Sequence, residues 1–223
     1  MKKQTIGFFI NKYTEKLATS LGRKDDVPNQ ELAKEIALKN DKEAINELIE
    51  ILKEIKDKKI QSDCIKTLYE IGYIKPELIE NYYDFFIELL KNKNNRLVWG
   101  AMIALKTISE VKPKEIFENL LVILEVTEKG SVISNDNGIG ILINLMKKQK
   151  LYDDVFPLLM EQLKICVPKQ LPMYAERILP VLKDKDKNEF IALLNGRINE
   201  LEKESQITRI EKVLKKLKTK NFL

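Results

Sequence analysis

One pattern constrains this chain more than any other: a small residue recurs every 37 positions, at Cys64, Ala101, Gly138 and Ala175. A leucine stands four positions after each small residue, at Leu68, Leu105, Leu142 and Leu179. A second apolar set lies earlier in each unit, at Leu48, Phe85, Val122 and Leu159, and again at Leu52, Leu89, Val126 and Leu163. Each unit therefore has two apolar stripes with helical spacing, which is typical of stacked helical hairpins.

The repeat predicts an all-α fold, an α-α superhelix (solenoid) of about five to six helical hairpins. Four regular units are expected over residues 40–183. Asn40 is expected to begin the first unit, and Pro76 and Pro113 the next two, because proline fits the first position of a helix. Residues 1–39 are expected to form an N-terminal cap and residues 184–223 a C-terminal capping hairpin, so that 1–223 is a single domain.

Composition favours an ordinary soluble protein, since 44% of the residues are hydrophobic and 33% are charged. No apolar run approaches the roughly 20 residues that span a bilayer, so we expect a cytoplasmic protein without membrane association. The net charge of +5 comes mainly from lysine, which is weak evidence for nucleic-acid binding. The lysines of the last predicted helix are interpreted as a solvated capping face.

The second unit resembles the HEAT-repeat family. It has a first helix with Phe85, Phe86 and Leu89, a polar turn with Asn95 and Arg96, and then an alanine-leucine stripe at Ala101, Ala104 and Leu105. The similarity covers residues 40–183, and the place of Arg96 is taken in the other units by Lys59, Ile133 and Gln170. The resemblance implies a right-handed superhelix whose second helices line a concave binding surface.

The sequence contains few of the residues and motifs that catalysis commonly requires. The chain has no histidine, which removes the commonest general base and metal ligand. Cys64 and Gly138 are small members of the repeat, and Gly138-Ile139-Gly140 is only a fragment of a phosphate loop. We therefore expect no enzymatic activity, no cofactor and no metal.

Three positions of each second helix are expected to point away from the core: two before, one before and two after the small residue. They give Ser62, Trp99, Asp136 and Met173; Asp63, Gly100, Asn137 and Tyr174; and Lys66, Ile103, Gly140 and Arg177. The binding strip predicted on the concave face consists of Asp63, Lys66, Trp99, Asp136, Asn137, Tyr174 and Arg177. The alternative for Trp99 is that its ring packs between helices.

Aromatic and arginine side chains dominate interface energies, so the strip predicts a protein-interaction module that binds a partner segment on its concave face. The alternative is nucleic-acid binding, by similarity to HEAT-like alkylpurine DNA glycosylases, with Trp99, Asp136 and Tyr174 in an aromatic cleft and Lys66 and Arg177 on phosphate. A third hypothesis, a scaffold that assists an enzyme, is not favoured by any particular residue.

Overall fold

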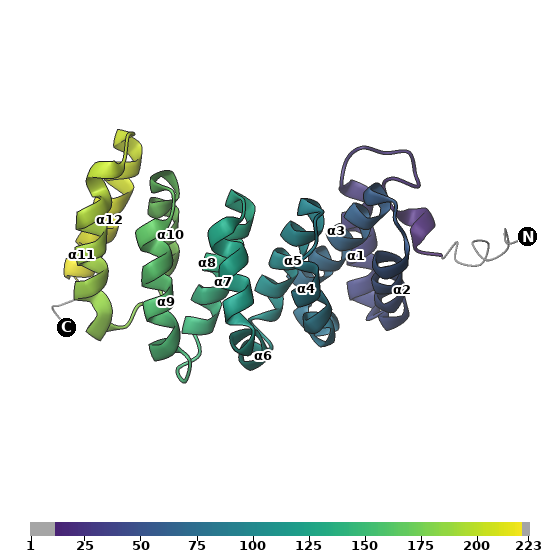
Figure 1. The fold of residues 1–223 in the computed structure, drawn as a ribbon, viewed down its shortest axis with the longest axis horizontal. Helices are drawn as coiled ribbons and strands as arrows, with labels where there is room; N and C mark the ends of the chain where they lie inside the picture. Colours follow the sequence, from purple (N-terminus) through teal and green to yellow (C-terminus); the bar gives the residue numbers. More distant parts are fainter. Residues whose placement is uncertain (1–11, 220–223) are drawn as a thin grey trace, which may run out of the picture. The chain divides into compact units, whose positions relative to one another are not determined.

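The computed structural model describes residues 12–219 of the chain (Figure 1). All of the regular elements within these residues are helices, which confirms the all-α class. The α-helices are α1 (Val27–Lys39), α2 (Lys42–Glu54), α3 (Lys58–Ile74), α4 (Tyr83–Leu89), α5 (Asn95–Ile108), α6 (Pro113–Glu118), α7 (Leu120–Lys129), α8 (Val132–Met146), α9 (Tyr152–Ile165), α10 (Leu171–Ile178), α11 (Lys187–Arg197) and α12 (Glu204–Thr219). No helix among these described residues is long and apolar enough to cross a membrane.

The chain divides into two compact units, one ending at Asn137 and the other beginning at Gly138, within α8. Each unit is described by itself below, as unit 1 and unit 2. The organisation of residues 1–223 as a single domain stays a prediction.

Unit 1 is built around α3, which packs against α1 on one side and α5 on the other. Helix α2 packs against α3, and α4 packs against α5. The small residues of the repeat lie in this core: Cys64 and Ala101 are fully buried, as are Leu68 and Leu105 four positions later. Burial raises the pKa of the Cys64 thiol well above its usual value, so this cysteine is a packing residue and not a reactive one.

Helices α3 and α5 approach each other closely at Gly100. A Cβ atom added to Gly100 would overlap the side chain of Ile65 on α3, and one added to Gly72 would overlap Thr107 on α5. Both glycines are buried. The two helices therefore fit together because each offers a glycine where the other offers a β-branched side chain.

The helix starts of unit 1 have side-chain caps. Asp41 accepts a hydrogen bond from the Ala44 N–H, Asp57 accepts from Lys59 and Ile60, and Asn94 accepts from Arg96. Such caps satisfy amides that have no partner within the helix. The prediction that Asn40 begins this unit is corrected by one residue: Asn40 ends α1 with φ of 51°, and Asp41 is the cap of α2.

The expected first helices of the second and third repeats are interrupted. Pro76 begins a short 3-10 helix, Pro76–Leu78, and another, Glu80–Tyr82, precedes α4. Pro113 begins α6 as predicted, but the helix stops near Asn119 before α7 starts.

Unit 2 contains α9 to α12, with α12 packed against both α10 and α11. Ala175 and Leu159, which belong to the predicted stripes, are fully buried here. Arg197, the last residue of α11, reaches the end of α9: its Nη1 donates to the Leu163 carbonyl and its Nη2 to the Cys166 carbonyl at 2.9 Å. Glu200 pairs with the same guanidinium.

Candidate binding surface

The three predicted surface positions differ in exposure. Two residues before the small position, Ser62, Trp99, Asp136 and Met173 are all partly exposed. Two residues after it, Lys66, Ile103 and Arg177 are partly exposed and Gly140 is buried. The first of the three positions is thus partly exposed in all four repeats, whereas the third is buried in one of them.

At the position directly before the small residue, three of the four residues are buried, so their assignment to the surface is wrong. Tyr174 is fully buried and Asn137 is 8% exposed, with its side-chain amide donating to the Ile133 carbonyl at 2.8 Å. Gly100 is the close contact with Ile65. A helix that packs against helices on both sides, as α3 does, buries a wider arc than the two apolar stripes mark.

Asp63 occupies the same position and is held by unit 1 itself. Its carboxylate accepts hydrogen bonds from the Thr19 N–H at 2.7 Å and from the Asn29 side-chain amide at 2.9 Å. Asn29 in turn accepts from the Ala18 N–H at 3.0 Å. This network fastens the loop before α1 to α3, so Asp63 positions that loop.

Lys66 is also engaged within unit 1. Its ammonium lies 2.8 Å from Glu70 and 3.5 Å from Asp26, and 4.9 Å from the centre of the Tyr69 ring. Burial acts to lower the pKa of Lys66, but the hydrogen bonds to Glu70 and Tyr69 outweigh it and the pKa is raised. With only 16% of its side chain exposed, Lys66 is a structural cation.

Trp99 lies in a shallow recess of about 240 Å³ that we call the aromatic groove. Its apolar lining comes from α3, α5 and α8, and consists of Ile65, Tyr69, Trp99, Ile103 and Ile133. Its polar edge consists of Asp26, Ser62, Asp63, Lys66 and Arg96. The structure therefore brings Asp63, Lys66 and Trp99 of the predicted strip to one recess of unit 1.

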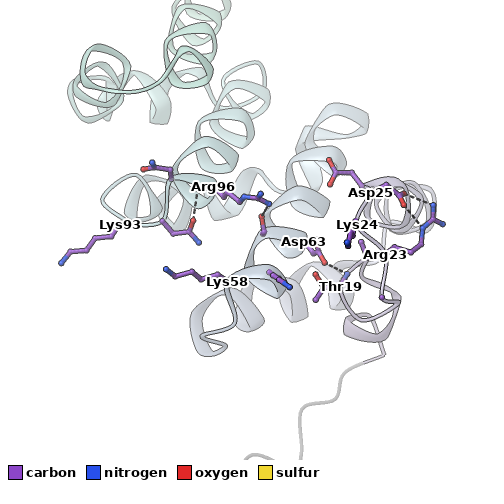
Figure 2. Close-up of a pocket in the computed structure, with 15 residues that line it drawn as sticks. Thr19, Arg23, Lys24, Asp25, Lys58, Asp63, Lys93 and Arg96 are labelled. Carbon is purple, nitrogen blue, oxygen red and sulfur yellow. Dashed lines mark hydrogen bonds and ion pairs between the residues drawn. The ribbon is translucent and has the colours of Figure 1, made fainter.

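A larger recess of about 760 Å³, the basic basin, opens beside the helix starts of unit 1 (Figure 2). Its cations come from three segments: Arg23 and Lys24 from the loop before α1, Lys58 and Lys59 from the start of α3, and Lys93 and Arg96 from the start of α5. Its carboxylates are Asp25, Asp26 and Asp63. Asp26, Ser62, Asp63 and Arg96 line both recesses, so the basin and the groove adjoin.

Most cations of the basin have no carboxylate partner. Arg23 is neutralised by Asp25 through two hydrogen bonds of 2.9 Å, which hold the pKa of Asp25 below its usual value. Among residues 12–219, by contrast, no ion pair is formed by Lys24, Lys58, Lys59, Lys93 or Arg96. The Arg96 guanidinium donates to the Ser62 hydroxyl at 3.3 Å.

The excess charge of the basin resides in side chains and not in free helix amides. Asp57 and Asn94 already accept the first-turn N–H groups of α3 and α5. Lysine side chains are long and mobile, so their ammonium groups can adjust to the positions of anionic groups on a ligand.

Sequence reasoning missed the basin, although a signal was present. Lysine-rich segments lie at the starts of two successive second helices, at 56–59 and 91–96, and Lys59 and Arg96 occupy equivalent positions in them. The turn before α8 differs, because Lys129 there is paired with Glu125 at 2.8 Å. Comparing the turns of successive repeats, and not only their helices, would have found the cluster.

Tyr174 and Arg177 belong to α10 of unit 2. The burial of Tyr174 removes it from any aromatic cleft, including the one implied by the resemblance to DNA glycosylases. Arg177 is partly exposed, as is Asp136 of α8 in unit 1. In the part of the chain that the structure describes, no group of three or more cysteine, aspartate or glutamate side chains could hold a metal ion.

The fold and this surface define an all-helical protein with an aromatic groove and an adjoining basic basin in unit 1. No protein-family model matches the chain, and no curated protein matches it.

Proposed function

We propose that this chain is a HEAT-like interaction module, a solenoid of helical hairpins, in which unit 1 holds an extended segment of a partner protein. The order of packing supports the solenoid, because α1, α3 and α5 follow one another and α2 and α4 cover α3 and α5. The second helices also begin at a constant interval of 37 residues, at Lys58, Asn95 and Val132. Stacking of equivalent hairpins gives this regularity.

The observation that carries the proposal is the partial exposure of Trp99 within the aromatic groove. Tryptophan contributes strongly to interfaces when a partner excludes water from it. Ile103, which is partly exposed, and Ile133, which is exposed, lie beside it and provide apolar area for a partner side chain. At the polar edge of the groove, Ser62 and Arg96 supply hydrogen-bonding groups for the backbone of the segment, as at a typical interface rim.

The chain contains a single tryptophan, so tryptophan emission reports on this groove alone. Twelve-residue peptides selected from a random display library on the wild-type protein are titrated while that emission is followed. We expect bound peptides to shift the emission, and the Trp99→Ala variant to bind the same labelled peptides about tenfold more weakly or worse.

The matched control is Leu121→Ala on α7, whose side chain is 83% exposed and lies outside the groove. Its affinity for the selected peptides should equal that of the wild type. The proposal is wrong if the selected peptides leave the emission unchanged and bind the Trp99→Ala variant as tightly as the wild type.

A further inference from the structure

We propose that the segment bound by unit 1 is acidic, with carboxylates in the basic basin and an apolar side chain in the aromatic groove. This inference rests on the proposed function and adds the chemical class of the partner. Its basis is the set of basin cations that form no ion pair within residues 12–219: Lys24, Lys58, Lys59, Lys93 and Arg96.

The carboxylates already in the basin do not neutralise these cations. Asp25 is taken by Arg23, and Asp63 accepts hydrogen bonds from Thr19 and Asn29. Asp26 lies 3.5 Å from Lys66, which belongs to the groove. Cations gathered in one recess repel one another, and an anionic ligand relieves that repulsion.

The arrangement of the cations also suggests a spacing for the ligand. They come from three segments that lead into α1, α3 and α5, and packed helices lie about 8–10 Å apart. An extended polypeptide advances about 3.3 Å per residue, so it meets a new turn roughly every third residue. The basin therefore fits a short segment with acidic side chains about three residues apart.

The mixed charge of the lining favours a polypeptide over a nucleic acid. Asp26, whose side chain is 65% exposed, stands on the same loop as Lys24 and would repel a continuous row of phosphates. A peptide can place a neutral residue opposite it. The face of Tyr69 is already approached by the Lys66 ammonium, which leaves Trp99 as the aromatic surface for stacking in the groove.

A single ligand can reach both recesses because they share four lining residues. An apolar residue of the segment would pack beside Trp99 while neighbouring carboxylates meet Lys58, Lys93 and Arg96. The basin supplies charge complementarity, and the groove supplies the apolar anchor.

The test compares three fluorescein-labelled probes by anisotropy. The first is a twelve-residue peptide with glutamate at every third position and leucines between; the second has glutamine in place of each glutamate; the third is a twelve-nucleotide thymidine oligonucleotide. We expect the glutamate peptide to bind at least about tenfold more tightly than the glutamine peptide in low salt, and to weaken as salt is added.

The basin variant is Lys58→Glu with Lys93→Glu, and it should bind the glutamate peptide at least about tenfold more weakly than the wild type. The matched control is Lys215→Glu with Lys218→Glu on α12, which makes the same change of net charge on exposed lysines of unit 2. It should bind the peptide as the wild type does. Thermal melting of both variants is monitored by circular dichroism, and equal melting temperatures establish that both are folded.

The inference is overturned if the glutamine peptide binds as tightly as the glutamate peptide, or if both double variants weaken binding equally. Tighter binding of the oligonucleotide, lost in the basin variant, would identify a nucleic-acid site instead. If the glutamine peptide binds tightly and shifts the Trp99 emission, only the acidic partner is refuted. If the basin variant binds the glutamate peptide more weakly but Trp99→Ala binds it as tightly as the wild type, the role of the aromatic groove in the proposed function is refuted. The role of the basic basin is then supported.

Discussion

Charged side chains at the helix ends have different roles in unit 1 and unit 2. In unit 1, Asp57 and Asn94 cap α3 and α5 from within their own turns, and the lysines beside them form no ion pair among the described residues. In unit 2, Arg197 binds the end of α9 from α11, through the carbonyls of Leu163 and Cys166. Arg197 is therefore part of the packing of unit 2, whereas the lysines beside Asp57 and Asn94 are the unit 1 cations that we propose meet a ligand.

The aromatic residues of the second helices show the same contrast. Trp99 of α5 is partly exposed and Tyr174 of α10 is fully buried, although both were predicted to share one strip. They differ by one position relative to the small residue of their repeats. A single step around a helix therefore separates a surface side chain from a core side chain.

The largest expected effect tests this pair of aromatic residues. Tyr174→Ala should lower the free energy of unfolding by about 3–5 kcal/mol, because it empties a fully buried aromatic site. Trp99→Ala should cost about 1 kcal/mol, since part of the ring already faces water. Urea unfolding followed by circular dichroism measures both. Equal losses would mean that Trp99 is a core residue and that the groove has no exposed anchor.

The next effect tests the internally bound turn of unit 2. Arg197→Ala should lower the free energy of unfolding by about 2–3 kcal/mol, because hydrogen bonds from a charged group to the ends of α9 are lost. Arg197→Lys should keep only part of this stabilisation, since a lysine ammonium lacks the forked geometry with which the guanidinium reaches both carbonyls.

The counterpart in unit 1 is Lys58→Ala, which should change the free energy of unfolding by less than about 0.5 kcal/mol because Lys58 is exposed and forms no ion pair among residues 12–219. The same urea titration measures it. A loss comparable to that of Arg197→Ala would contradict the view that the basin lysines do not stabilise the fold.

Alanine substitutions at two glycines should have effects of opposite sign on stability. Gly100→Ala should destabilise unit 1 by about 1–3 kcal/mol, because the new Cβ overlaps Ile65 on α3. Gly196→Ala in α11 should stabilise by up to about 1 kcal/mol, since that position opens to free space and alanine favours helix. Thermal melting of both variants distinguishes them, and a stabilising Gly100→Ala would disprove the tight contact of α3 and α5.

Small effects are also expected from ion pairs that join elements within each unit. Hydrogen bonds from Lys16 and Lys39 lower the pKa of Glu35 to about 2, and those from Arg209 lower the pKa of Glu176. Because both folded-state pKa values lie below the unfolded values, the stabilisation is complete above about pH 4.5 and is lost as pH falls toward the folded pKa. These partly exposed pairs should contribute less than about 1 kcal/mol each.

The measurement for these pairs is the melting temperature between pH 6 and pH 2. The decline on acidification should be shallower in Glu35→Gln and in Glu176→Gln than in the wild type. An unchanged decline in either variant would show that its ion pair does not contribute to stability.

The repeat pattern predicted the all-α class and the burial of the small residues. It did not predict the interruptions before α4 and between α6 and α7, or the partial exposure of the stripe residues Phe85, Val122, Val126 and Leu179. Cys64, Ala101 and Ala175 are all fully buried, and Pro113 begins a helix as expected. These features depend on residues a few positions apart, whose apolar spacing is legible within one helix. The same spacing did not reveal that Gly100, Asn137 and Tyr174 are buried, because it marks an angle on a helix and not which neighbours cover that angle.

The candidate site likewise has features that follow from local sequence and features that depend on tertiary packing. The sequence by itself determined that the protein is all-helical, that its small residues pack, and that Trp99 stands beside the core stripe, because each is a local property of helical periodicity. Only the tertiary structure decided that Lys24, Lys58 and Lys93 share one recess beside that tryptophan. Those lysines are far apart in the chain and meet only when α1, α3 and α5 pack in succession, so their unbalanced charge is a property of the fold.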